Sequence, residues 1–182
     1  PVYAEGSDSA ANKDYLYTDD EDMPKQRQAI AGGLAGVVVS NGSTSSLDGF
    51  RNEGSVTSAN RIAAGVVGYA CYMSTNITRC CNVGAVESQG GYPSNAVDTD
   101  IPASVGGVAA GLVGIAVADP YVMDCYNRGP VKSAWLAGGL YGIVEGLADR
   151  AIGDPDEQAG FASSYNAGTV TTTYDQGDAF PD

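Results

Sequence analysis

The sequence predicts an all-β fold, a β-solenoid in which four repeat units with loop insertions stack along one axis. Three observations predict it. Two blocks of residues recur four times in the same order, glycine accounts for 25 of the 182 residues, and most residues between the glycines of the first block are aliphatic. Self-similar units of roughly 20–50 residues are typical of solenoids, in which each unit buries its apolar face against the next.

The first block reads Ala-[Ala/Gly]-Gly-[Leu/Val]-x-Gly and is followed by an aliphatic residue or tyrosine. Glycine costs a helix about 1 kcal/mol per position, and β-branched residues favour strands. Runs such as 34–39 and 112–117 carry apolar residues or glycine on both alternating faces. This pattern is typical of strands buried on both sides, as in parallel sheets. The glycines that we interpret as structural are Gly33, Gly36, Gly65, Gly68, Gly111, Gly114, Gly139 and Gly142.

The second block reads Asn-x-Gly-x-Val and follows each first block. Asparagine and glycine tolerate left-handed backbone angles, so the block predicts a strand, a turn and a second strand. If the units stack in register about 4.8 Å apart, equivalent residues lie above one another. The asparagines would then form a ladder in which each amide bonds to the next turn. The ladder would consist of Asn52, Asn82, Asn127 and Asn166.

A second column is expected two residues before each asparagine. Its side chains are unrelated, which indicates packing and not chemistry: they are Phe50, Cys80, Cys125 and Ser164. Cys71 and Cys81 complete the set of four cysteines, and no Cys-x-x-Cys pair occurs, so zinc and thioredoxin signatures are absent. The cysteines could be free buried thiols or form disulfides, and the sequence does not decide between the two. Stacked Cys80 and Cys125 would form a disulfide only with suitable geometry.

The chain divides into three parts on this pattern. Residues 30–174 form the solenoid, with units at about 30–58, 62–88, 108–133 and 136–172. Residues 1–29 contain seven acidic side chains and are interpreted as a cap or a degenerate turn, and 175–182 as a polar tail. Insertions at 89–103 and 145–160 fall between the blocks, as surface loops do. We expect the chain, which begins Pro-Val-Tyr, to be part of a longer or processed protein.

The acidic composition excludes several classes of function. The formal net charge is −13, so the chain repels phosphate backbones and anionic membrane surfaces. We therefore expect no nucleic-acid partner and no membrane insertion. The longest apolar run, 105–118, has 14 residues and is too short to span a bilayer as a helix. Histidine is absent, which removes the commonest general base and most zinc sites. No cofactor and no catalytic residue are expected.

Two groups of residues are candidates for binding. Asp154, Asp156 and Glu157 surround a proline and could hold Ca²⁺ through oxygen ligands, although no EF-hand spacing is present. The alternative is solvated loop charge, and no other metal is expected. Tyrosine is frequent, and five tyrosines could form an exposed contact patch or pack along a sheet face. These are Tyr69, Tyr72, Tyr92, Tyr121 and Tyr141.

The paired blocks, Gly-[Leu/Val]-x-Gly and then [Cys/Phe]-x-Asn-x-Gly-x-Val, resemble the GLUG-type repeats of bacterial surface proteins. Such repeats occur in adhesin-like proteins and in the non-catalytic region of some immunoglobulin A metallopeptidases. The resemblance covers roughly 30–174. It implies a right-handed parallel β-helix and a bacterial extracellular or cell-surface setting, and it supplies no catalytic residue. The first and fourth units depart from the pattern, with Phe50-Arg51 and Ser164-Tyr165 where the third has Cys125-Tyr126.

The function expected is that of a non-catalytic module, an adhesion platform or stalk whose loops contact a host or bacterial surface protein or a glycan. A polysaccharide-degrading β-helix enzyme is the first alternative, with Asp154 and Asp156 as its best carboxylates. The absence of histidine and the scarcity of lysine and arginine argue against it. The second alternative is a ligand-free spacer in a large surface peptidase.

Overall fold

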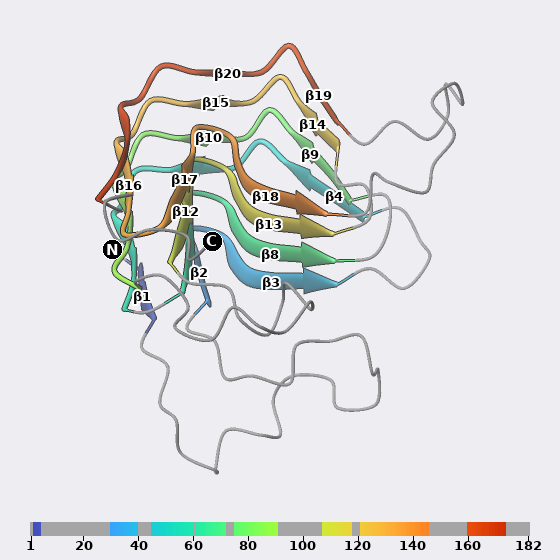
Figure 1. Ribbon diagram of the computed structural model, residues 1–182. Coiled ribbons are helices and arrows are strands. Elements are labelled where there is room, and N and C mark those ends of the chain that lie inside the picture. Colours follow the sequence, from blue (N-terminus) through green and yellow to red (C-terminus); the bar gives the residue numbers. More distant parts are fainter. Residues whose placement is uncertain are drawn as a thin grey trace, which may run out of the picture.

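The computed structural model describes residues 2–4, 30–39, 45–59, 61–71, 75–90, 107–117, 121–145 and 160–173. Within these ranges the regular elements are all strands and none is a helix. The chain winds through four coils, and each coil adds one strand to each of five parallel sheets (Figure 1). The predicted all-β solenoid of four stacked units is confirmed.

The five sheets follow one another around each coil. The first contains β2 (Ile30–Gly32), β7 (Ile62–Ala64), β12 (Val108–Ala110) and β17 (Leu136–Gly138). The second contains β3 (Ala35–Val39), β8 (Val67–Cys71), β13 (Val113–Val117) and β18 (Tyr141–Glu145). The third contains β4 (Ser45–Asp48), β9 (Thr75–Thr78), β14 (Tyr121–Met123) and β19 (Gly160–Ala162).

The fourth and fifth sheets are built from the second sequence block. The fourth contains β5 (Arg51–Asn52), β10 (Cys81–Asn82), β15 (Tyr126–Asn127) and β20 (Tyr165–Asn166). The fifth contains β1 (Val2–Ala4), β6 (Val56–Ser58), β11 (Val86–Ser88), β16 (Val131–Ser133) and β21 (Val170–Thr172). The first coil is β2–β6, the second β7–β11, the third β12–β16 and the fourth β17–β21.

Neighbouring coils pair in register, motif position on motif position. In the first sheet Ala63 lies between Ala31 and Ala109, and in the fifth Val86 lies between Val56 and Val131. The units differ in length, so this register requires the extra residues to lie outside the paired strands. Of the insertions predicted at 89–103 and 145–160, residues 91–103 and 146–159 lie outside the described residues, whereas Glu145 ends one strand and Gly160 begins the next.

An additional strand precedes the first coil. β1 pairs in parallel with β6, with Val2 beside Val56 and Ala4 beside Ser58. Residues 2–4 therefore occupy the place of the last strand of a further turn. The rest of the acidic segment predicted as a cap or degenerate turn lies outside the described residues.

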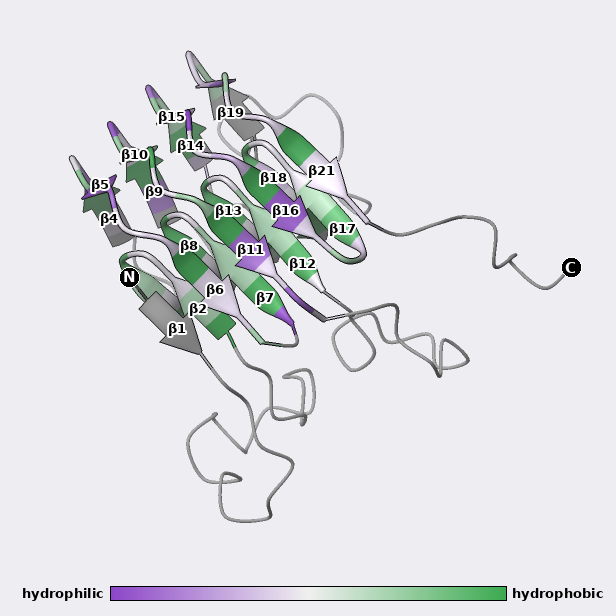
Figure 2. Ribbon diagram, turned by 90° about the vertical axis from the view of Figure 1, so that its left-hand side faces the viewer, coloured by the Kyte–Doolittle hydropathy of each residue, from purple (hydrophilic) through white to green (hydrophobic). Residues whose placement is uncertain are grey.

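Among the described residues, the core consists of three clusters of buried, mostly small or branched side chains. In the fifth sheet valine and serine point inward and the residue between them points outward, so β11 and β16 each carry one hydrophilic position at their centre (Figure 2). The second and third coils bury Val66, Val67, Leu112 and Val113 completely. Side chains alternate between inward and outward in the fifth sheet, whereas both faces of the second sheet are buried. Both arrangements follow from the pattern of apolar residues.

Residues with a left-handed backbone, which have positive φ, lie at the corner after the third sheet, and the sequence analysis did not predict them there. The described residues with positive φ are Gly49 (71°), Arg79 (50°), Asp124 (54°) and Ser163 (49°), one in each coil directly after the third sheet. The interpretation of the Asn-x-Gly block as the left-handed turn is therefore wrong. Its glycine is needed for close approach instead: a Cβ at Gly84 would overlap the carbonyl group of Gly54 in the previous coil.

Candidate functional site

The four asparagines of the second block lie on one column inside the coils. Each amide nitrogen donates to the amide oxygen of the next asparagine, at 2.7 Å from Asn52, 2.8 Å from Asn82 and 2.7 Å from Asn127. It also donates to the carbonyl oxygen of the glycine two residues on, at 2.8–2.9 Å. Both hydrogens are thus bonded, which is required of a buried amide. Asn52, Asn82 and Asn127 therefore hold the coils together and have no amide hydrogen left for a ligand, whereas the exposed Asn166 donates to the carbonyl oxygen of Gly168.

The glycines of the first block face this ladder across the coil interior. A Cβ on Gly33 would lie 2.9 Å from Cγ of Asn52, and one on Gly65 would lie 2.5 Å from Cγ of Asn82. Contacts this short do not occur between real side chains. The two sequence blocks therefore recur together because each asparagine needs a glycine opposite it. The last glycine of the first block, such as Gly68 or Gly114, packs against the aliphatic residue that opens the previous coil.

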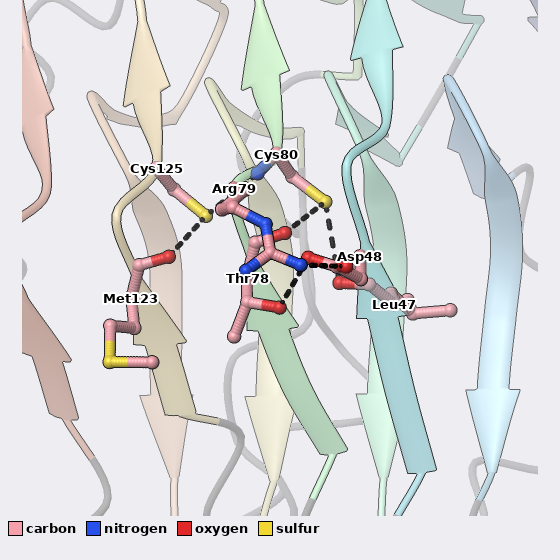
Figure 3. A network of polar contacts seen from close by, with 7 residues as sticks. All are labelled: Leu47, Asp48, Thr78, Arg79, Cys80, Met123 and Cys125. Carbon is pink, nitrogen blue, oxygen red and sulfur yellow. Dashed lines mark hydrogen bonds and ion pairs between the residues drawn. The ribbon is translucent and has the colours of Figure 1, made fainter.

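The predicted second column contains two free buried thiols (Figure 3). The backbone N–H of Cys80 donates to Sγ of Cys125 at 3.2 Å. The Cys125 thiol in turn lies 3.1 Å from the carbonyl oxygen of Met123. Hydrogen bonding with Cys80, and then burial, raise the pKa of the Cys125 thiol. Both thiols bond within the core, so their role is packing. Cys81 is also free, and the Cys71 side chain lies outside the described residues.

A polar clamp lies beside these thiols at the left-handed corner of the second coil (Figure 3). Arg79 forms an ion pair with Asp48 of the first coil, and the hydroxyl of Thr78 donates to Oδ1 of Asp48 at 2.8 Å. The hydrogen bond from Thr78, together with Arg79, lowers the pKa of Asp48. The clamp joins the first two coils at this corner.

The outer face of the fourth sheet carries the most distinctive group of polar side chains in the described residues. Residues on either side of each buried asparagine point outward, because successive strand residues alternate. The column before the asparagines contains Arg51, Cys81, Tyr126 and Tyr165. Arg128 follows the third asparagine. We call Arg51, Tyr126, Arg128 and Tyr165 the arginine–tyrosine ledge.

The ledge is held together by contacts across three coils. The rings of Tyr126 and Tyr165 stack at 5.6 Å between centroids, with planes 14° apart. The guanidinium carbon of Arg128 lies 5.1 Å from the centroid of the Tyr126 ring, and its Nη2 donates to the hydroxyl oxygen of Tyr165 at 3.2 Å. Cation–π contacts and arginine hydrogen bonds both favour a fixed guanidinium.

Arg51 reaches this group from the first coil. It extends past Cys81, 3.9 Å from Sγ, and its Nη1 donates to the hydroxyl oxygen of Tyr126 at 3.1 Å. Its Nε also binds Glu53 at 2.6 Å. The small cysteine in the second coil is what leaves room for the long side chain. The hydroxyls of Tyr126 and Tyr165 accept from arginine, and the Tyr126 hydroxyl is also hydrogen-bonded to Cys81.

The sequence did not single out the ledge. The ledge residues occupy the two variable positions of x-Asn-x-Gly. The sequence shows which residues these are, but only the register between coils shows that they lie side by side. The tyrosines that were singled out lie elsewhere. Tyr69 is 4 % exposed and packs in the core, so its place in an exposed patch was wrong and the packing alternative holds for it. Tyr121 and Tyr141 are half-buried, and burial raises the pKa of Tyr141. Tyr72 and Tyr92 lie outside the described residues.

The acidic residues proposed for Ca²⁺, Asp154, Asp156 and Glu157, lie outside the described residues. Within the described ranges no group of three or more histidine, cysteine or acidic side chains could hold a metal ion. The same ranges contain no helix long and apolar enough to cross a membrane. They hold five basic and five acidic side chains, so the whole net charge of −13 falls on the other segments.

Comparison with protein-family models, with curated proteins and with solved structures finds no match to this chain.

Proposed function

We propose that this chain is a non-catalytic repeat module of a bacterial secreted or cell-surface protein, and that it acts as a rigid binding platform or stalk. The observation that carries the proposal is that the inward and outward positions of each coil differ in role. Inward positions repeat from coil to coil and bond to one another, whereas outward positions vary. The resemblance to GLUG-type repeats supports the same setting.

The interior supports a structural role because its polar groups already have partners. Asn82 and Asn127 are fully buried, and both use their amide hydrogens within the stack. The thiols of Cys80 and Cys125 bond to backbone carbonyls of their own and the previous coil. Groups so engaged stabilise the rod and take no part in chemistry on a bound molecule.

The outer face supports a binding role because the register spaces different side chains regularly. Successive coils place one outward residue about every 4.8 Å along each sheet. On the fourth sheet this yields the arginine–tyrosine ledge, and on the fifth an ion pair between Glu87 and Lys132 at 3.1 Å. A rod of this kind recognises a partner through several fixed contacts and orders few side chains when it binds, which favours affinity.

The direct test is binding by the immobilised chain to panels of glycans and of extracellular proteins. The chain is expected to retain a subset of the panel reversibly and to release no new reducing ends from polysaccharides. Release of reducing ends would contradict the non-catalytic role and favour the β-helix enzyme. Retention of nothing from either panel would contradict the platform and favour the spacer.

A further inference from the structure

Two guanidiniums of the ledge contact the same tyrosine: Arg51 donates to the Tyr126 hydroxyl, and Arg128 lies over the Tyr126 ring. The hydrogen bond to Tyr165 raises the pKa of Arg128, and the positive charge of Arg51 opposes this rise only weakly. The two groups therefore act on one another electrostatically while both stay charged. Because Glu53 neutralises Arg51, the unneutralised charge of the ledge is that of Arg128, and it favours a ligand of the opposite sign.

The charge of Arg128 is not neutralised by a carboxylate in the part of the chain that the structure describes. Arg51 has Glu53 as its partner, whereas the contacts of Arg128 are the Tyr165 hydroxyl and the Tyr126 ring. These contacts orient the guanidinium and leave some of its five N–H donors unused. A fixed guanidinium with free donors is well suited to a carboxylate, which it binds through two parallel hydrogen bonds.

From this arrangement we propose that the ledge binds a glycan through a carboxylate-bearing sugar, with Arg128 on the carboxylate and Tyr165 beside the sugar ring. The proposal rests on the binding-platform function. Tyr165 is 46 % exposed and is the last described ring of its row. Its flat face can pack on the apolar C–H face of a pyranose, while its hydroxyl can donate to a sugar oxygen.

The chain's overall charge selects among acidic ligands. At a net charge of −13 the whole molecule repels dense polyanions such as nucleic acids. A glycan with a single carboxylate avoids most of this repulsion and still satisfies Arg128. An acidic peptide also offers a carboxylate, but it lacks the rigid apolar ring face that matches the tyrosine stack. These arguments favour a sparsely charged glycan.

The test compares an oligosaccharide that ends in glucuronate with the same oligosaccharide ending in glucose, by titration calorimetry on the full chain. The glucuronate probe is expected to bind at least tenfold more tightly. Arg128→Gln is expected to remove about that factor, since it removes the charge and the paired hydrogen bonds that a guanidinium gives a carboxylate. Lys132→Gln is the matched control: it loses the same charge from the fifth sheet and should bind like the wild type. Arg128 is exposed, and an unchanged circular dichroism spectrum will show that the variant is folded.

Four outcomes would overturn the inference. Equal affinity for the two probes, or unchanged binding by Arg128→Gln, would exclude the ledge as a carboxylate site. Tighter binding of a Glu-rich peptide that displaces the glucuronate probe would assign the ledge to a protein partner. In each of these cases binding elsewhere on the panels would leave the platform function standing. A chain that binds nothing on the panels would contradict both.

Discussion

The two middle coils and the fourth coil carry the same motifs in the same register, yet they differ in burial. Asn82 and Asn127 are 0 % exposed, whereas Asn166 at the same position is exposed. Val131 is 1 % exposed and Val170 is 37 % exposed. The residues are alike, so the difference comes from having a described neighbour on both sides or on one. In a solenoid, stability resides in the interfaces between units.

The largest expected difference between middle and end lies in the ladder. Asn82→Ala would leave the amide of Asn52 without its acceptor and Asn127 without its donor, both in the buried column. Unsatisfied buried groups cost about 1–3 kcal/mol each, so a loss of about 3 kcal/mol is expected. Asn166→Ala removes one hydrogen bond of the ladder, the one from Asn127, and should cost about 1 kcal/mol, because Asn166 is exposed and water can replace the lost acceptor. Urea unfolding followed by circular dichroism measures both, and equal losses would refute the comparison.

The glycines that face the ladder should differ in the same direction. A Cβ at Gly65 would meet the carbonyl oxygen of Gly111 and the buried Asn82. Gly65→Ala is expected to cost about 2–3 kcal/mol, because the backbone of the next coil must move. At Gly139 the nearest atoms belong to the exposed side chain of Asn166. Gly139→Ala should therefore cost about 1 kcal/mol. The order of the two unfolding midpoints decides the matter, and a less stable Gly139 variant would contradict it.

Truncating the equivalent valines of the third and fourth coils tests how much the two coils differ in apolar burial alone. Val131→Ala removes fully buried methyl groups and leaves a cavity, which should cost about 2 kcal/mol. Val170→Ala should cost about half as much, since part of that side chain is already in water. Thermal unfolding of the two variants is the measurement. Indistinguishable transitions would mean that other contacts bury Val170 in solution.

The smallest effect is expected on the outer face, even in the middle coils. Glu87 and Lys132 form an exposed ion pair at 3.1 Å. Such pairs contribute about 0–1 kcal/mol, and salt screens them. A double-mutant cycle with Glu87→Gln and Lys132→Gln should give a coupling below about 1 kcal/mol that disappears in high salt. A larger, salt-insensitive coupling would show that the outer face also stabilises the coils, against the difference in role proposed for inward and outward positions.

Much of the fold could be predicted from residue patterns, for a physical reason. In-register stacking repeats the same local environment in every coil, so a residue needed there recurs and becomes visible as a motif. The column of Asn52, Asn82, Asn127 and Asn166 follows from the repeat alone. The ledge could not be predicted in this way, because its residues do not repeat. Arg51 and Tyr126 are 75 residues apart and meet only because Cys81 between them is small.

By itself, the sequence determined the strand-forming blocks, their order and the buried polar ladder, because these depend on local propensity and on periodic burial. Only the tertiary structure decided that the glycine of one block faces the asparagine of the other across the coil. It alone located the left-handed corner at residues as different as Arg79 and Ser163. The glycine–asparagine contact and the position of the corner both depend on where the chain bends to close a coil. Those bends are set by the stack of coils as a whole.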